Sequence, residues 1–111
     1  MPKAKPVEVL QIHFEETCRY RGRPLHDALV QKCRESGIAG ATVFRGVEGY
    51  GAAAEIHRER WLTHRQPIIV VIVDTPENIR RLLPLVEEMM DTGLITVSQA
   101  EGIRVEKPLP A

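Results

Sequence analysis

Hydrophobic and polar positions along the chain follow two different periods, which together predict four strands and two helices. Between Val7 and Phe14 the residues alternate, with one face apolar and the other half polar, as in a β-strand. The run 68–73 is apolar at every position, which is typical of a strand covered on both faces. Strand-forming residues also concentrate at 42–47, and two short runs, 94–97 and 103–105, predict a last strand with an interruption.

Two further segments have the spacing of amphipathic helices. The first extends from Pro24, which suits the first helical position because its missing N–H costs nothing there, to Gly37. The second begins after Thr75, a good N-cap residue, and is closed by Gly93. Pro84 lies inside this second helix, so we expect a kink or a break there. The expected buried residues of the second helix are Ile79, Leu82, Leu83, Val86 and Met90.

The order strand–helix–strand–strand–helix–strand is that of the ferredoxin-like βαββαβ fold, a four-stranded antiparallel sheet with two helices on one face. We therefore expect an α+β protein with a single domain spanning residues 1–111. Residues 1–6 form a polar lead-in and residues 107–111 a proline-bearing tail. Because two helices cover only one face, the apolar residues on the other face predict an oligomer.

The composition narrows the classes of function. With 15 basic and 15 acidic residues the formal net charge is zero, which argues against a general nucleic-acid or membrane-surface binder, since both need a positive field. The third strand also lacks aromatic side chains on which RNA bases could stack. The two cysteines have no metal-ligand spacing, and no apolar run is long enough to span a bilayer. These features predict a soluble, cytoplasmic protein.

The glycine-rich stretch 37–51 has the features of a functional segment. Its last three glycines allow positive φ angles or a close approach of the backbone to a ligand. The segment that follows, 52–66, is too long for a simple hairpin, and such segments are usually functional or disordered. In the expected topology this segment leaves the same end of the sheet as the connection after the first strand and the turn at 91–93.

Basic side chains gather just before the first helix. The free N–H groups of a helix N-terminus favour a phosphate or a carboxylate, and arginine offers bidentate donors. A further arginine at the end of the second strand could join this anion site. Alternatively, the same arginines are solvated or form weak surface ion pairs with nearby glutamates. The arginines are Arg19, Arg21, Arg23 and Arg45, and the candidate partners are Glu15, Glu16 and Glu48.

Histidines suggest a second chemistry. His57 and His64 lie in segment 52–66 and could bind a metal ion or titrate near neutral pH, although ordinary surface or packing histidines have the same spacing. No pair of nucleophile and base is identifiable among the remaining side chains, which predicts that the protein is not an enzyme.

The glycine pattern resembles that of the PII (nitrogen-regulatory) signal-transduction family. The run Gly37-Ile38-Ala39-Gly40-Ala41-Thr42-Val43, followed by Gly49-Tyr50-Gly51, is similar to the segment that leads into the PII T-loop. An uncharacterised PII-like family matches more closely, from Val7 to Val105. Its further marks are Gly22-Arg23-Pro24-Leu25, Gly46-Val47-Glu48, Ile56-His57 and Val71-Ile72-Val73-Asp74-Thr75-Pro76.

The resemblance implies a homotrimer whose sheets face inward and which binds an adenine nucleotide such as ATP, ADP or AMP between subunits. It also implies that 52–66 is a T-loop-like segment that engages a partner protein, such as a membrane transporter. PII proteins hold phosphate with a Gly-Asp-Gly-Lys loop, whereas this chain has Asp91-Thr92-Gly93-Leu94 there, without a lysine. A bound phosphate therefore needs arginine instead.

The predicted effector site combines residues chosen for their charge with residues placed by the resemblance. It comprises Arg19, Arg21, Arg23, Thr42, Arg45, Gly46, Gly49, Tyr50, Gly51 and Arg104. The alternative function is that of a metal-binding protein related to the cation-tolerance proteins, which share the fold. Its candidate ligands are His13, His26, His57 and His64.

Overall fold

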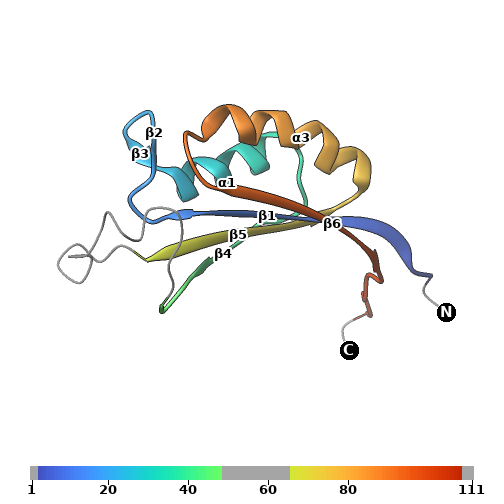
Figure 1. Ribbon diagram of the computed structural model, residues 1–111. Helices are drawn as coiled ribbons and strands as arrows, with labels where there is room; N and C mark the ends of the chain where they lie inside the picture. Colours follow the sequence, from blue (N-terminus) through green and yellow to red (C-terminus); the bar gives the residue numbers. More distant parts are fainter. Residues whose placement is uncertain (1–2, 49–65, 109–111) are drawn as a thin grey trace.

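The computed structural model describes residues 3–48 and 66–108 and contains one four-stranded antiparallel sheet in the order β4-β5-β1-β6, with two helices on one face (Figure 1). A two-stranded ribbon, β2-β3, stands beside the helices. The elements are β1 Lys5–Glu15, β2 Arg19–Tyr20, β3 Arg23–Pro24, α1 Leu25–Glu35, β4 Thr42–Arg45, β5 Pro67–Asp74, α3 Pro76–Met89 and β6 Leu94–Gly102. The predicted ferredoxin-like architecture is confirmed.

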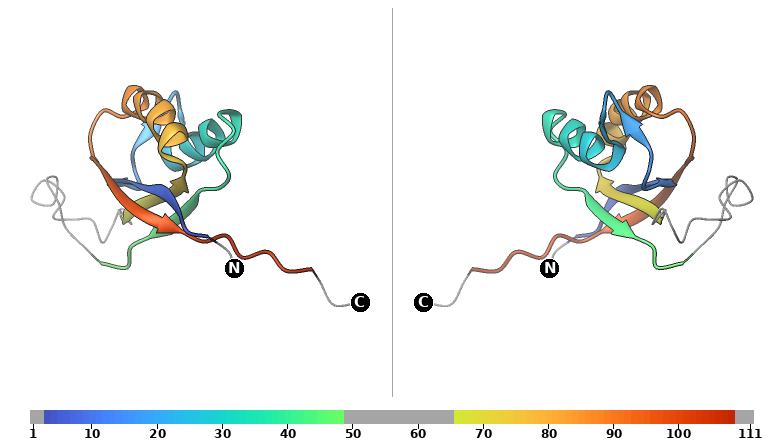
Figure 2. Two further views of the ribbon diagram at one scale, coloured as in Figure 1. Left: turned by 90° about the vertical axis from the view of Figure 1, so that its right-hand side faces the viewer. Right: turned by 90° about the vertical axis from the view of Figure 1, so that its left-hand side faces the viewer.

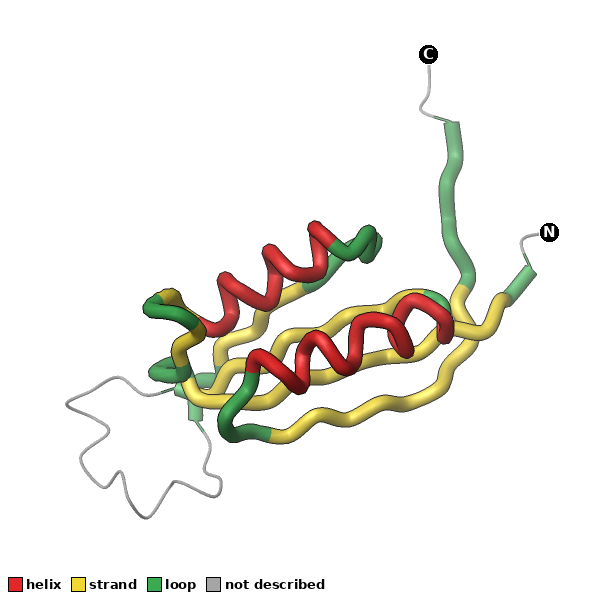
Figure 3. Tube along the Cα trace, turned by 90° about the horizontal axis from the view of Figure 1, so that it is seen from above, coloured by secondary structure: helices red, strands yellow, loops and turns green. Residues whose placement is uncertain are grey.

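The core lies between the sheet and the helices, which run side by side along the strands (Figure 3). Strand β1 is central and pairs with β5 on one side and with β6 on the other. Its even-numbered residues face the helices because side chains alternate along a strand, and Leu10 and Ile12 are completely buried. Helix α1 contributes the predicted apolar stripe of Leu25, Ala28, Leu29 and Cys33. Helix α3 contributes Ile79, Leu82 and Val86 as predicted, together with Met89, whereas the predicted Leu83 is only partly buried.

Neither helix nor any other element in residues 3–48 and 66–108 covers the opposite face of the sheet. Val9 and Val71 are half-buried on this face, and Val73 and Leu94 are 49% and 59% exposed. Phe44, on the edge strand β4, is 53% exposed on the same face. We call this surface the open face. Contacts among the described residues therefore explain the apolar side chains on one face of β5 but not those on the other.

Helix α3 differs from the prediction in two ways. It runs without a break from Pro76 to Met89 although Pro84 lies inside it. Proline removes one backbone hydrogen bond, but the stripe Ile79, Leu82, Val86 and Met89 is buried on both sides of Pro84 in the sequence, and this packing keeps both halves helical. The helix also ends four residues before Gly93, so Met89 rather than Met90 fills the last core position.

Gly93 has a different role from the predicted one. It has φ = +135° in the turn that leads into β6. A Cβ atom at this position would lie 2.5 Å from the carbonyl oxygen of His13. Glycine is therefore required for the close approach of this turn to β1, not for closing the helix.

Three other boundaries also differ. Pro24 is the N-cap residue of α1, and the first helical residue is Leu25. Strand β6 is continuous over Leu94–Gly102, because its whole length pairs with β1, whereas residues 103–108 continue away from the sheet (Figure 2). The predicted loop before α1 contains the β2-β3 ribbon. Gly37 has φ = +75°, as expected of a residue that ends a helix.

The carboxylate of Asp74 ties the start of α3 to the connection between α1 and β4. Oδ1 accepts hydrogen bonds from the backbone N–H of Thr75 (2.7 Å) and from Asn78 Nδ2 (2.8 Å), and Oδ2 accepts one from the backbone N–H of Ala39 (3.0 Å). Partial burial raises the pKa of Asp74, but these three hydrogen bonds and the charge of Arg81 outweigh it and hold the pKa below its ordinary value.

No helix in the described ranges is long and apolar enough to cross a membrane.

We expect Asp74→Ala to lower the free energy of unfolding by about 1–2 kcal/mol at neutral pH, because three donors lose their acceptor. The pKa of Asp74 is lower in the folded than in the unfolded state, so its contribution is complete above the unfolded pKa and is lost as the pH falls through the folded pKa. In urea unfolding, the difference between wild type and variant should shrink on acidification. Glu88→Ala, at an exposed position of α3, is the control; a difference that is constant with pH would contradict the prediction.

Candidate functional site

Three connections meet at one end of the sheet. Strands β1 and β4 both run antiparallel to β5, so their final residues, Glu15 and Arg45, lie at the same end. The first residue of β6, Leu94, pairs with His13 near the end of β1, which brings the turn 91–93 to this end as well. The predicted convergence of these connections is confirmed.

Residues just after β1, at the end of β4 and at the start of β5 are joined by hydrogen bonds. We call this group the strand junction; it consists of Glu16, Arg45, Gly46, Gln66 and Pro67. The Arg45 Nη2 atom lies 2.7 Å from the Glu16 Oε2 atom in a charge-assisted hydrogen bond. The backbone N–H of Glu16 donates to the Gln66 carbonyl (2.9 Å), and the N–H of Gly46 donates to the Pro67 carbonyl (2.7 Å). Of the two alternatives for Arg45, the ion pair with a neighbouring glutamate is present.

The β2-β3 ribbon presents three arginines at the same end of the molecule (Figure 1). Arg21 and Gly22 form its tip with φ = 51° and 82°, and the Arg21 guanidinium lies 5.1 Å from the centre of the Tyr20 ring. Arg19 pairs with Pro24 and Tyr20 with Arg23, so Arg19 and Arg23 leave opposite faces of the ribbon. The three arginines therefore raise the local positive potential but do not converge on one small anion.

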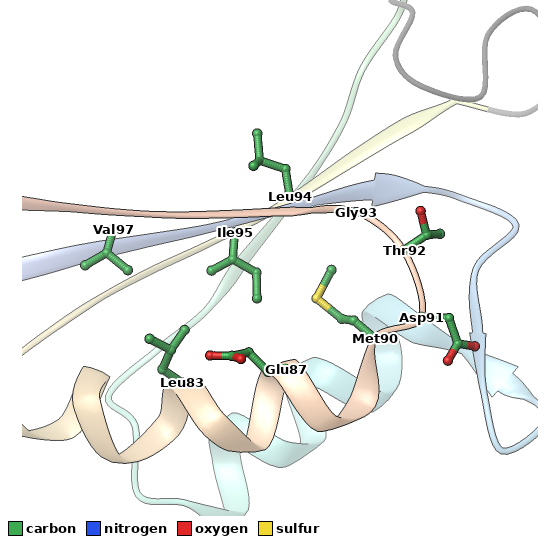
Figure 4. A pocket seen from close by; sticks show the side chains of 9 residues that line it. All are labelled: Leu83, Glu87, Met90, Asp91, Thr92, Gly93, Leu94, Ile95 and Val97. Carbon is green, nitrogen blue, oxygen red and sulfur yellow. The ribbon is translucent and has the colours of Figure 1, made fainter.

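A groove of about 480 Å³ lies between α3 and β6 (Figure 4). Its floor is apolar, and its polar groups come from the end of α3 and from the turn that follows. Figure 4 shows Leu83, Met90 and Ile95 pointing toward one another between the helix and the strand, whereas Leu94 points to the other side. The lining residues are Leu83, Glu87, Met90, Asp91, Thr92, Gly93, Leu94, Ile95 and Val97.

The charge at this groove is negative. Glu87 and Asp91 stand at the C-terminal end of α3, whose last turn has no basic residue. A helix C-terminus carries partial negative charge, so the groove suits an apolar or neutral group better than a phosphate. The sequence indicated the turn 91–93 but not Glu87, whose spacing is that of an ordinary surface position, and it placed Met90 in the core because of its helical spacing.

The other predicted site residues are dispersed. Thr42 is exposed on β4, on the open face beside Val71. Arg104 follows the end of β6, which pairs with the first residues of β1, so within one chain it lies at the opposite end of the sheet from Arg45. The candidates Gly49, Tyr50 and Gly51, and the segment 52–65, lie outside the described residues.

The described histidines do not form a metal site together. His13 is half-buried on the open face, whereas His26 lies on α1 with Nδ1 3.1 Å from the Asp27 carboxylate. Within residues 3–48 and 66–108 no group of three or more His, Cys, Asp or Glu side chains could hold a metal ion. His57 and His64 lie outside these ranges.

Cys33 has no reactive character. Its side chain is in the core, and burial raises the pKa of the thiol to about 11. A thiol with this pKa is almost entirely protonated at neutral pH, and the thiolate is the nucleophilic form. Cys33 therefore contributes packing rather than chemistry.

Comparison with solved structures defines the class of fold. The chain is similar to CPII from Thiomonas intermedia K12, a nitrogen regulatory PII-like protein. A CPII structure with ADP, AMP and acetate has a TM-score of 0.62 at 19% identity and covers 92% of this chain and 93% of that chain. One with ADP and bicarbonate has a TM-score of 0.61 at 18% identity, covering 94% and 95%. The fold is PII-like.

Sequence comparison then gives the family. The model of the DUF190 family, described as "Uncharacterized ACR, COG1993", matches residues 7–102. A UPF0166 protein of Methanocaldococcus jannaschii is 37% identical, covering 96% of this chain and 97% of the relative. One of Aquifex aeolicus is 35% identical, covering 86% and 92%. The chain belongs to this DUF190 (UPF0166) family, the uncharacterised PII-like family that the sequence resembles.

The strand junction requires a glycine at position 46. A Cβ atom there would lie 2.5 Å from the Cγ atom of Pro67, a ring atom that cannot rotate away. We expect Gly46→Ala to lower the free energy of unfolding by about 1–3 kcal/mol, as overpacking does elsewhere. Gly40→Ala is the matched control, because a Cβ at Gly40 meets nothing within 4 Å. Equal chemical denaturation midpoints for the two variants would show that the junction is not tightly packed.

Proposed function

We propose that this chain is a cytoplasmic, non-enzymatic PII-like regulator that binds a small anionic effector, an adenine nucleotide, between the subunits of a homotrimer. One observation carries the proposal. The arginine and the apolar groove that suit the two parts of a nucleotide lie at opposite edges of the same sheet, on β4 and β6. A single chain thus offers two half-sites that a neighbouring copy would complete.

The open face supports the assembly. Burying apolar surface such as Val9, Phe44, Val71 and Val73 against other copies stabilises an oligomer by about 25 cal/mol for each Å² removed from water. If three copies pack these faces around a common axis, the β4 edge of one copy approaches the β6 edge of the next. The groove would then accept the base, and Arg45 the phosphate.

The effector chemistry follows from the two half-sites. The groove is apolar on its floor and negative at its mouth, so it favours a flat, weakly polar group. Arg45 offers paired N–H donors that match the oxygens of a phosphate. At the same edge of the sheet, Thr42 offers the effector a hydroxyl group, and Gly46 allows it a close approach to the backbone. CPII, with a similar fold, is bound to ADP and AMP in one of its structures, which makes these nucleotides the first to test.

The regulatory output would come from segment 52–66. It lies in the sequence between β4, which ends at Arg45, and β5, which begins at Pro67, so an effector at these strand ends is close to it along the chain. We propose that effector binding changes how this segment engages a partner protein, as in order–disorder switches.

The nucleotide proposal predicts binding that depends on Arg45. In calorimetric titrations with ATP, ADP and AMP, we expect micromolar affinity for at least one of them. Arg45→Ala should weaken this affinity at least about tenfold, because a charge-assisted hydrogen bond contributes roughly 1.5–3 kcal/mol. Arg34→Ala, in the last turn of α1, is the matched control and should bind normally. Absence of binding for all three nucleotides would refute the proposed effector class.

The assembly proposal predicts a mass three times the 12.5 kDa of the chain in size-exclusion chromatography with light scattering. Val71→Glu, on the open face, should yield a folded monomer, because a carboxylate in an apolar interface loses its hydration. Arg80→Glu, exposed on α3, should remain trimeric. A wild-type protein that is monomeric at micromolar concentration would overturn the assembly.

A further inference from the structure

We propose that Glu16 is a built-in competitor for the anionic group of the effector, so that an effector anion reaches Arg45 only by displacing the Glu16 carboxylate. The inference rests on the proposed function and adds a residue that sets the affinity of that site. It concerns the strand junction alone.

The first observation is the contact between the two side chains. Arg45 Nη2 and Glu16 Oε2 are 2.7 Å apart, the short distance of a charge-assisted hydrogen bond. The two side chains are 52% and 31% exposed, so an ion from solution can reach the pair. Such an exposed pair contributes little to stability, and it can exchange partners at low cost.

The second observation is that Glu16 is held in place by its backbone. Its N–H donates to the carbonyl of Gln66, and the N–H of Cys18 donates to the carbonyl of Glu15. These bonds fix the start of the connection after β1 beside the ends of β4 and β5. The Glu16 carboxylate therefore meets Arg45 as an intramolecular ligand, without the loss of translational freedom that a free anion incurs.

The third observation is the contrast with the arginines of the ribbon. The side chains of Arg19 and Arg23 are exposed and form no hydrogen bond or ion pair with another described residue. An anion can approach them freely, but they leave opposite faces of the ribbon. Arg45 is already paired. Glu16 thus occupies the phosphate position proposed at the β4 edge.

This arrangement implies selection among anions. A free carboxylate offers the Arg45 guanidinium the same charge and the same acceptor oxygens as Glu16 does, and it also loses translational freedom when it binds. A phosphate carries more charge and more acceptor oxygens, so it exchanges more favourably. Glu16 therefore lowers the affinity for every anion at Arg45 and leaves only the more highly charged ones able to bind.

The test is calorimetric titration of ADP and adenosine into the full chain. Glu16→Gln should bind ADP about three- to fivefold more tightly than wild type, the range that exposed ion pairs allow. Glu35→Gln is the matched control, since Glu35 pairs with Lys32 on α1 at the other end of the sheet. Adenosine has no anionic group, so its affinity should be the same for all three proteins.

The outcomes separate the two proposals. Equal ADP affinities for wild type and Glu16→Gln, or weaker binding by the variant, overturn the competitor role and leave the nucleotide site intact. If neither protein binds ADP, the same titration is made with ATP and AMP, and absence of binding of all three nucleotides refutes both proposals. ADP binding by Glu16→Gln but not by wild type supports the competitor role, because Glu16 then prevents ADP binding altogether. If Glu16→Gln fails to fold by circular dichroism, Glu16→Asp replaces it; its shorter carboxylate should raise the ADP affinity in the same direction by a smaller factor.

Discussion

Burial of one face of β1 against the helices is the contact on which the rest of the structure depends. Leu10, Ile12 and Phe14 belong to one buried cluster with residues of both helices, and burying each such side chain stabilises the fold by about 1.5–3 kcal/mol. Because β1 is also the strand between β5 and β6, its position fixes the register of both neighbours. Through this register the turn before β6 and the last residue of β4 lie at the same end of the sheet as the last residue of β1.

The elements that the sequence predicted well are those defined by local patterns. Alternation predicted β1, an unbroken apolar run predicted β5, and the N-cap of α3 was recognised at Thr75, whose hydroxyl accepts a hydrogen bond from the N–H of Asn78 at 3.2 Å. The errors arose where distant residues decide. Pro84 does not interrupt α3 because the stripe before and after it is buried in the core, and Gly93 is required by the carbonyl of His13, eighty residues earlier in the chain. The continuity of β6 likewise follows from pairing with β1 rather than from its own composition.

The candidate site was predictable in part for the same reason. Arg45 was identified from its place at a strand end, but whether it was free or paired with Glu16 depended on a contact across β5. The groove was not predicted, because Leu83, Met90 and Ile95 have the spacing of core residues and line a groove only where the sheet ends beside α3. Local sequence identifies charged groups well, whereas concave surfaces depend on how separate elements are juxtaposed.

The unequal edges of the sheet have a consequence for the chain on its own. The β4 edge is a strand of 4 residues, whereas β6 is a strand of 9 residues whose outer edge has no neighbouring strand in the part of the chain that the structure describes. A long free edge is a template on which other extended chains can add, including those of unfolded or damaged proteins. An assembly that closes on itself would cover this edge, so quaternary structure would protect against aggregation as well as complete a binding site. Loss of a subunit would then expose the β6 edge to other extended chains and would also leave the binding site between subunits with only one of its two halves.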